Sequence, residues 1–469
     1  VDGSSNAIKD NSSIFIFDVM TDFSECVNNV SYLIKSSAGA DTVVSYVDTL
    51  IKIPLPEPKS LHSVTNSGVH AGQVREAGVT TYSSPLSKER VRLMTDPGQP
   101  YMAPRFYLKG SDGKRVYLTT GDYLDINSSV TFTLSSTGMT QPPVLGFVLE
   151  RLYDISKDKE NILQFIKLQI DKIYANHIYF YSQRDINDEG LIYIYHNWES
   201  GTDNSPLWDD IWKTMNPPKY KFERKDTTHV DPSQRPTNRE YDHYLNIIEI
   251  AKKYNYNDEK IALHSPFLVI DPLFNSILIR SNEALIRLYK ILGGNKEKIN
   301  YLKKQNFKSI DALNKKLFRN DLGAYVHYDL RNEKHILSLS SSSFSPLFCG
   351  APNKKRGIKL LNTFMNKFGD PKYYLCASFN PKDKKFNPKK YWRGPVWINL
   401  NWILYNGLKR YGFNEIAQRI KDDSIFLIEK NGFYEYFDPR KKISNIENIG
   451  YGGSNFSWSA ALYLDFLND

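Results

Sequence analysis

The spacing of apolar positions along the chain changes near residue 140. Before this point, residues 105–109, 115–120 and 130–134 form short runs of β-branched and aromatic residues, which favour β-strands. Residues 55–104 hold many Pro, Gly and Ser residues, which are typical of irregular structure. We therefore expect a β-rich or irregular N-terminal region over residues 1–136, followed by a different domain over residues 137–469.

Beyond residue 140, apolar residues recur at the spacing of one helix face. The apolar side of the first predicted helix, at residues 143–153, holds Val144, Leu145, Val148, Leu149 and Leu152. Eight further helices are predicted at residues 161–174, 241–251, 271–292, 310–318, 354–368, 395–410, 415–429 and 459–467.

Local signals indicate where some of these helices begin and end. Pro395 suits a first helical position, Asn414 is expected to cap the helix that follows it, and Gly432 is expected to lie just past that helix's end. Helices that each bury one stripe of apolar residues must pack on one another. Short loops between consecutive helices make them antiparallel hairpins. The sequence therefore predicts a mainly α fold for residues 137–469.

Composition narrows the classes of function. The net charge is +9, but the lysines alternate with acids and asparagines, which indicates a solvated basic surface and not a nucleic-acid partner. Three scattered cysteines support neither a disulfide framework nor a zinc site, so a reducing compartment is expected. The absence of a long apolar run argues against a membrane span, and no signal peptide is evident, so we expect a cytoplasmic protein.

The candidate chemistry is densest in residues 198–206, Trp-Glu-Ser-Gly-Thr-Asp-Asn-Ser-Pro. This segment fits neither helical nor strand periodicity, so it is predicted to be a loop. A loop that combines an indole, two carboxylates and a glycine is a common place for binding or catalytic groups. A turn in which Asp203 or Asn204 bonds the local backbone is an equally good interpretation of these nine residues alone.

Three more loops beside predicted helices combine aromatic and polar residues, and their ends would converge on one cavity if the hairpins form a ring. They lie at residues 224–241, 391–397 and 432–439, the last of which is followed by residues 455–458. His196 is interpreted as a hydrogen-bonded loop histidine, and the scattered histidines show no metal-binding spacing. Trp397, Trp402 and Phe456 are expected to be core or supporting residues. We therefore predict neither a metal nor a cofactor.

Five motifs occur in the order seen in glycoside hydrolase family 63, and together they make the resemblance specific. They are Gln141-Pro-Pro, the 198–206 loop, Tyr391-Trp-Arg-Gly-Pro-Val-Trp, Glu435-Tyr-Phe-Asp-Pro and Phe456-Ser-Trp-Ser-Ala-Ala. Over residues 137–469 the chain resembles the short members of that family, the mannosylglycerate and glucosylglycerate hydrolases. The resemblance implies an (α/α)6 toroid and an inverting α-glycosidase.

Carried over by motif, the resemblance implies that Asp203 is the general acid and Glu435 the general base. An inverting site holds such a pair roughly 6.5–9.5 Å apart, with a water beside the base. Apolar neighbours such as Trp198 would raise the pKa of the acid. The residues expected to bind substrate are Gln141, Trp198, Arg235, Tyr241, Tyr391 and Trp392.

Other roles are open for several of these residues. Glu435 could be a surface acid beside a turn, Arg235 could form a surface ion pair, and Tyr241 could be a core aromatic. An arginine fork and phenols do, however, suit the carboxylate of glycerate, which the resemblance implies for Arg235, Tyr241 and Tyr391.

Residues 1–136 depart from the family pattern. They contain no tryptophan and no counterpart of the Trp-Asp-Ser/Thr helix that opens the family's toroid. The leading hypothesis is hydrolysis of a small α-glycoside such as glucosylglycerate or mannosylglycerate. The alternatives are an α-glucosidase that trims an oligosaccharide and a catalytically defective sugar-binding homologue. The expected partner is a small-molecule glycoside, and the oligomeric state stays open, a homo-oligomer included.

Overall fold

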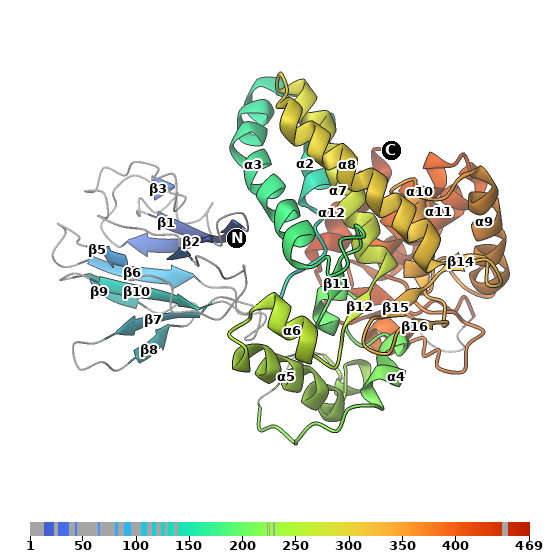
Figure 1. Ribbon diagram of the computed structural model, residues 1–469, viewed down its shortest axis with the longest axis horizontal. Helices are drawn as coiled ribbons and strands as arrows, with labels where there is room; N and C mark the ends of the chain where they lie inside the picture. The colour runs from blue at the N-terminus through green and yellow to red at the C-terminus, as the bar shows by residue number, and fades with distance from the viewer. Residues whose placement is uncertain are drawn as a thin grey trace. The chain divides into compact units, whose positions relative to one another are not determined.

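The computed structural model describes ten strands between residues 14 and 135, and then residues 139–469 apart from 223, 225, 228–229 and 443–448 (Figure 1). The chain divides into two compact units. One unit comprises Val1–Thr140, Tyr174–Tyr179 and Ala251–Ile261, and the other comprises Gln141–Ile173, Phe180–Ile250 and Ala262–Asp469.

The described strands of the N-terminal region form two sheets, with the orders β3-β1-β2-β6-β9 (β4 also pairing with β2) and β5-β10-β7-β8. The strands are β1 (Ile14–Asp22), β2 (Val27–Ser36), β3 (Val43–Val44), β4 (Val64–Thr65), β5 (Thr80–Tyr82), β6 (Glu89–Met94), β7 (Arg105–Lys109), β8 (Arg115–Leu118), β9 (Tyr123–Ile126) and β10 (Val130–Ser135). The three predicted β runs are confirmed as β7, β8 and β10. The irregular structure predicted for residues 55–104 is wrong where β4, β5 and β6 pair with neighbouring strands.

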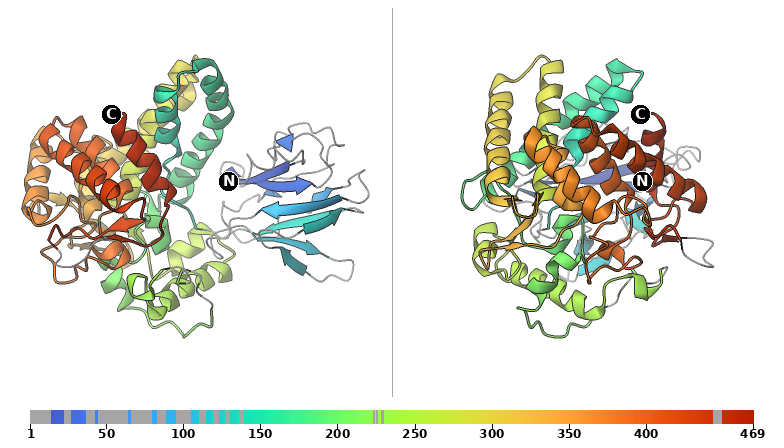
Figure 2. Two further views of the ribbon diagram at one scale, coloured as in Figure 1. Left: turned by 180° about the vertical axis from the view of Figure 1, so that it is seen from behind. Right: turned by 90° about the vertical axis from the view of Figure 1, so that its right-hand side faces the viewer.

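Helices dominate the rest of the chain and have the predicted (α/α)6 toroid architecture. They are α2 (Leu145–Ile155), α3 (Lys159–Gln183), α4 (Asp209–Trp212), α5 (Asn238–Lys253), α6 (Asp258–His264), α7 (Pro272–Ile291), α8 (Lys296–Ala312), α9 (Lys354–Phe368), α10 (Ile398–Arg410), α11 (Asn414–Asn431) and α12 (Ser457–Leu467). The pairs α7 with α8 and α10 with α11 form packed hairpins. Figure 2 shows the red helices α10, α11 and α12 grouped together.

Side-chain caps explain several helix starts. Asp271 accepts from the Leu273 amide at 2.6 Å ahead of Pro272, and Asn295 and Asn353 cap α8 and α9 in the same way. The predicted cap at Asn414 is wrong, because this residue is the first of α11 and no side chain caps that helix. The helix predicted at residues 310–318 is the C-terminal part of a longer helical segment, because α8 continues as the π-helix η4 (Leu313–Leu317) before β13 (Phe318–Arg319) begins.

The buried face of α2 matches the predicted one only in part, since Leu149 of the predicted stripe is buried but three other members are exposed. Leu145, Val148 and Leu152 are 54%, 39% and 40% exposed, whereas Phe147 is buried. Helix α2 packs on α7 so closely that a side chain at Gly146 would lie within 2.8 Å of the Ser281 backbone oxygen and Cβ. The close approach at Gly146 therefore helps to set which side of α2 faces the core, together with the buried side chains of Phe147 and Leu149.

Short antiparallel strands complete the helical part. One described sheet has the order β11-β12-β15-β16, formed by β11 (Tyr193–Ile194), β12 (Val269–Ile270), β15 (His327–Asp329) and β16 (Lys334–Ile336). Two further pairs join β13 (Phe318–Arg319) to β14 (Ala324–Tyr325), and β17 (Tyr436–Phe437) to β18 (Gly450–Tyr451). Among the described residues, no helix is long and apolar enough to cross a membrane.

Candidate active site

Asp203 lies in a loop that begins with a short 3-10 helix, η1 (Asn197–Ser200). His196 caps this helix, with its Nδ1 accepting a hydrogen bond from the Trp198 amide at 3.1 Å. Gly201 ends the helix in the left-handed conformation, with φ of 68°, which favours glycine. The glycine of the motif therefore turns the chain immediately before the predicted acid.

A buried ion pair fixes this loop in place. The side chains of Glu199 and Arg184 are both fully buried, and Nη1 of the arginine lies 3.2 Å from Oε1 of the glutamate. Oε2 of Glu199 also accepts from the amides of Tyr195 at 2.8 Å and His196 at 3.3 Å. Because its oxygens are occupied by the protein itself, Glu199 is a structural residue, which leaves Asp203 as the acid of the loop that can act on a ligand.

The surroundings of Asp203 favour its protonated form. The residue is half-buried, and its Oδ2 accepts a hydrogen bond from the Tyr391 hydroxyl at 3.3 Å. Burial raises the pKa of Asp203 to about 7; the Tyr391 hydroxyl and the Arg235 charge lower the pKa, and the charge of Glu435 raises it. A carboxyl with such a pKa keeps its proton in about half of the molecules at pH 7, so a protonated general acid is available near neutral pH.

The turn that carries Trp392, η6 (Tyr391–Arg393), is fastened to the loop of the predicted acid. The Trp392 amide donates to Oδ1 of Asn204 at 3.0 Å. Arg393 donates to the Asn204 carbonyl at 3.3 Å and pairs with both carboxylate oxygens of Asp209, at 2.8 and 2.7 Å. Two motifs almost 190 residues apart are thus held in one arrangement.

Glu435 is 5% exposed and comes immediately before β17. Its amide donates to the Gly453 carbonyl at 2.9 Å, and its Oε2 accepts from the Gly453 amide at 3.1 Å. Gly452 adopts φ of 74°, and a side chain at this position would overlap the carboxylate of Glu435. The glycine pair therefore both holds Glu435 and leaves space for it.

Arg235 connects the two predicted catalytic acids. It follows the short helix η3 (Pro232–Gln234), and its side chain is only 10% exposed. Its Nη1 and Nη2 donate to Oε1 and Oε2 of Glu435 at 3.1 and 2.5 Å. Its guanidinium carbon lies 4.6 Å from the ring centre of Tyr391, whose hydroxyl reaches Asp203.

The other residues predicted to bind substrate lie in the same connected cluster. Trp198 is 8% exposed and packs edge-on against Tyr241 at 6.2 Å between ring centres. The exposed Gln141 donates to the Trp198 carbonyl at 3.3 Å. Trp392 is 3% exposed and stacks on Trp397 at 3.5 Å. The structure therefore brings all eight predicted site residues together, and their roles remain predictions.

His196 is fully buried, and burial lowers its pKa to about 3. Its Nε2 lies 3.0 Å from the Tyr244 carbonyl, so the imidazole is a neutral, hydrogen-bonded loop residue, as predicted. In the part of the chain that the structure describes, no group of three His, Cys, Asp or Glu residues could hold a metal ion.

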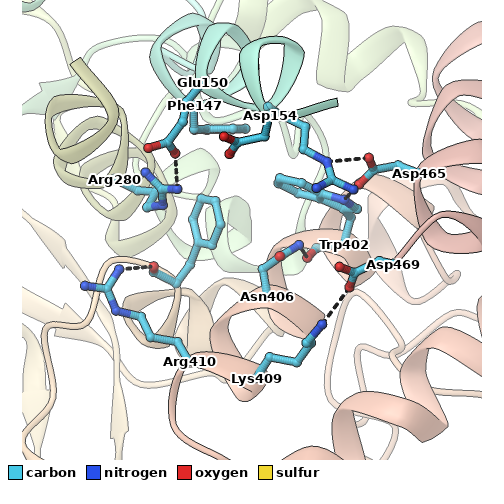
Figure 3. A pocket seen from close by; sticks show the side chains of 12 residues that line it. Phe147, Glu150, Asp154, Arg280, Trp402, Asn406, Lys409, Arg410, Asp465 and Asp469 are labelled. Atoms are coloured by element: carbon cyan, nitrogen blue, oxygen red, sulfur yellow. Dashed lines mark hydrogen bonds and ion pairs between the residues drawn. The ribbon is translucent and has the colours of Figure 1, made fainter. Parts of the chain in front are cut away.

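A separate cavity of about 390 Å³ lies among α2, α7, α10 and α12, and none of the predicted site residues line it. Figure 3 shows Glu150 pointing towards Arg280 and Asp469 pointing towards Lys409. Arg280 pairs with Glu150, and Lys409 pairs with Asp469 at 2.7 Å. This cavity is lined by self-paired charges and lacks the unlike carboxylates of the site around Asp203.

The supporting residues of the site were largely missed by sequence reasoning. The buried pairing of Glu199 with Arg184 has no periodic signature, although both residues stand in polar motifs. The Gly452-Gly453 doublet was a local signal for close backbone approach and could have been connected with Glu435.

Comparison with known proteins agrees with these motifs. A family model described as "Mannosylglycerate hydrolase MGH1-like glycoside hydrolase domain" matches residues 100–459. The chain is 37% identical over 333 residues to a mannosylglycerate hydrolase from Thermus thermophilus, covering 70% of this chain and 77% of that protein. It is 30% identical over 348 residues to a glucosylglycerate hydrolase from Mycolicibacterium hassiacum, covering 71% and 75%.

A solved structure gives the same result. The crystal structure of a family 63 mannosylglycerate hydrolase from Thermus thermophilus, in complex with Tris and D-glycerate, has a TM-score of 0.66 and 36% identity, covering 71% of this chain and 78% of that one. The residues that the family model matches, 100–459, include the loops of both predicted catalytic carboxylates. This chain belongs to the mannosylglycerate hydrolase MGH1-like domain family of glycoside hydrolase family 63.

Proposed function

We propose that this protein hydrolyses the α-glycosidic bond of glucosylglycerate or mannosylglycerate with inversion at the anomeric carbon. The observation that carries the proposal is the pair of unlike carboxylates, in which Asp203 has a pKa of about 7 and Glu435 is paired with Arg235. The names of the relatives at 37% and 30% identity support the two substrates.

The proposed reaction assigns one step to each carboxylate. Asp203 donates its proton to the glycosidic oxygen as the bond from this oxygen to C1 breaks. A water attacks C1 from the opposite face and gives its proton to Glu435. The products are the β-anomer of the hexose and free glycerate, and proton exchange with solvent resets both groups.

An acidic aglycone is favoured over a neutral oligosaccharide because the buried Arg235 pairs with Glu435 and packs on Tyr391, whose hydroxyl bonds Asp203. A planar guanidinium suits a carboxylate, and phenols such as Tyr391 and Tyr241 can add hydrogen bonds. The D-glycerate bound in the Thermus crystal structure fits this aglycone.

We also propose that residues 137–469 carry the activity and that residues 1–136 form a separate region. The cytoplasm is the proposed compartment, which is supported by the free, buried thiols of Cys349 and Cys376.

The test is hexose release by the purified protein from glucosylglycerate, mannosylglycerate and a panel of neutral α-disaccharides. We expect turnover of one or both glycosylglycerates that far exceeds turnover of the neutral substrates. Faster cleavage of the neutral substrates would favour the oligosaccharide-trimming alternative. Sugar-dependent stabilisation without any product would favour the defective homologue.

A further inference from the structure

The predicted general base is held by an arginine on both of its oxygens. Nη1 and Nη2 of Arg235 donate to Oε1 and Oε2 of Glu435, and both side chains are about nine-tenths buried. Oε2 also accepts from the Gly453 amide at 3.1 Å. A carboxylate oxygen has about two acceptor sites, so Oε2 is filled and Oε1 keeps one.

This pairing opposes the task of a general base. When Glu435 takes a proton from water, it loses its charge, and the two charge-assisted bonds to Arg235 weaken together. Such bonds are roughly twice as strong as neutral ones. A base released from the arginine therefore accepts the proton of the attacking water more readily than a base that is still bound.

The substrate's carboxylate would compete for the same edge of the same guanidinium. Two-point recognition of a carboxylate uses two parallel N–H groups, and Glu435 already occupies Nη1 and Nη2. The remaining nitrogen, Nε, is buried and has no hydrogen-bond partner among the described residues, so it offers no exposed second edge. An acidic ligand that gains the two-point contact must therefore displace Glu435.

We propose that the carboxylate of the substrate takes Arg235 away from Glu435 and thereby activates the base. This inference rests on the proposed function, because it requires an acidic aglycone and Glu435 as base. Arg235 then acts as a positioning residue that selects substrates through the rate of the chemical step. A neutral glycoside leaves the base bound to the arginine and is cleaved slowly even when it is fully bound.

The direct test uses α-mannosyl and α-glucosyl fluoride with the full-length wild-type protein. Fluoride leaves C1 without needing a proton, water attacks C1, and its proton passes to Glu435 and then to solvent. The aglycone space stays open, so D-glycerate can be added separately. We expect saturating D-glycerate to raise kcat for the fluoride at least about tenfold, within the about 10²–10⁴-fold contribution of a general base. Glycerol, the neutral analogue, should give no increase.

Variants provide a second readout. In Arg235→Gln we expect kcat for the fluoride without glycerate to rise towards the activated wild-type value, and activation by glycerate to disappear. Arg235→Lys should keep part of the activation. Arg239→Gln is the matched control, because this arginine lies in the helix α5 that follows, is partly exposed and pairs with Asp242. It should behave like wild type.

The outcomes separate this inference from the proposed function. If the wild-type protein cleaves glycosylglycerates but glycerate only inhibits fluoride hydrolysis, Arg235 binds substrate without releasing the base, and the inference is wrong while the function stands. If kcat of Arg235→Gln falls and glycerate has no effect on the wild type, the pairing instead orients the base, which also overturns the inference. No cleavage of either substrate type would overturn both.

Discussion

The raised pKa of Asp203 makes folding stability depend on pH in a direction that one substitution should remove. Below about pH 4 the residue is protonated in both the folded and the unfolded chain. Between about pH 4 and 7 the folded state keeps a proton that the unfolded state has lost, because the folded pKa is about 7 against an ordinary 3.8. The free energy of unfolding therefore falls as pH rises through this window and stays low above it.

The magnitude follows from the size of the pKa shift. Each pKa unit corresponds to 1.36 kcal/mol, so a shift of about three units destabilises the protein by about 4 kcal/mol at pH 8 relative to pH 4. Asp203→Asn keeps the shape of the side chain, stays neutral and can still accept the Tyr391 hydrogen bond. The variant should therefore lose this contribution and be more stable than wild type at pH 8 by up to about 4 kcal/mol.

The assay is urea unfolding of wild type and Asp203→Asn at pH 5 and pH 8. Between these two pH values the wild type should lose about 3 kcal/mol more than the variant, because the remainder of the about 4 kcal/mol is already lost at pH 5. Taking the difference between the proteins cancels the titration of every group that does not interact with Asp203. Asp210→Asn serves as the control, because this carboxylate is 57% exposed and its pKa is lowered by Lys213, so it stays ionised throughout. If the free energy of unfolding depends on pH in the same way for wild type and Asp203→Asn, the pKa of Asp203 is not raised and the reasoning is wrong.

Three further predictions concern the surroundings of the two acids. Tyr391→Phe removes a hydrogen bond that lowers the pKa of Asp203. The fall of kcat/KM on the alkaline side of the pH profile, expected near pH 7, should therefore move to higher pH by about one unit. A fall at the same or a lower pH would contradict the assignment of Asp203 as the general acid. Glu199→Gln breaks the fully buried pair with Arg184 and should lower the free energy of unfolding by about 3–5 kcal/mol in a denaturant titration, whereas a loss below about 1 kcal/mol would show that the pair is not needed. Gly452→Ala should lower kcat at least about tenfold while circular dichroism shows a folded protein, because the added methyl group displaces the predicted base; full activity would mean that the base tolerates movement.

The helical architecture could be predicted from the sequence because it depends on local patterns. Residues 354–368 were predicted as a helix and form α9 with the same bounds, since one apolar stripe and the cap at Asn353 coincide. The orientation of α2 could not be predicted in this way. Leu145 and Val148 satisfy the period of a buried stripe, but contact between Gly146 and α7 turns them outward.

The sequence could name candidate residues for the site, but it could not predict the contacts between them. The ordered motifs were enough to name Asp203 and Glu435 as candidates, and the resemblance to the family added Arg235. The bidentate pairing between Arg235 and Glu435 joins residues 200 positions apart, and no spacing rule connects them. Likewise, the burial that raises the pKa of Asp203 arises from packing among several distant loops.

The central claim is that Asp203 and Glu435 hydrolyse an α-glycoside by direct attack of water. The most direct measurement is time-resolved proton NMR of the anomeric signals during cleavage of mannosylglycerate and glucosylglycerate by the wild-type protein. The account predicts that the β-anomer of the released hexose accumulates first and then mutarotates to the equilibrium mixture. Initial release of the α-anomer would show that a glycosyl-enzyme forms, and it would contradict the assignment of Glu435 as a base that activates water.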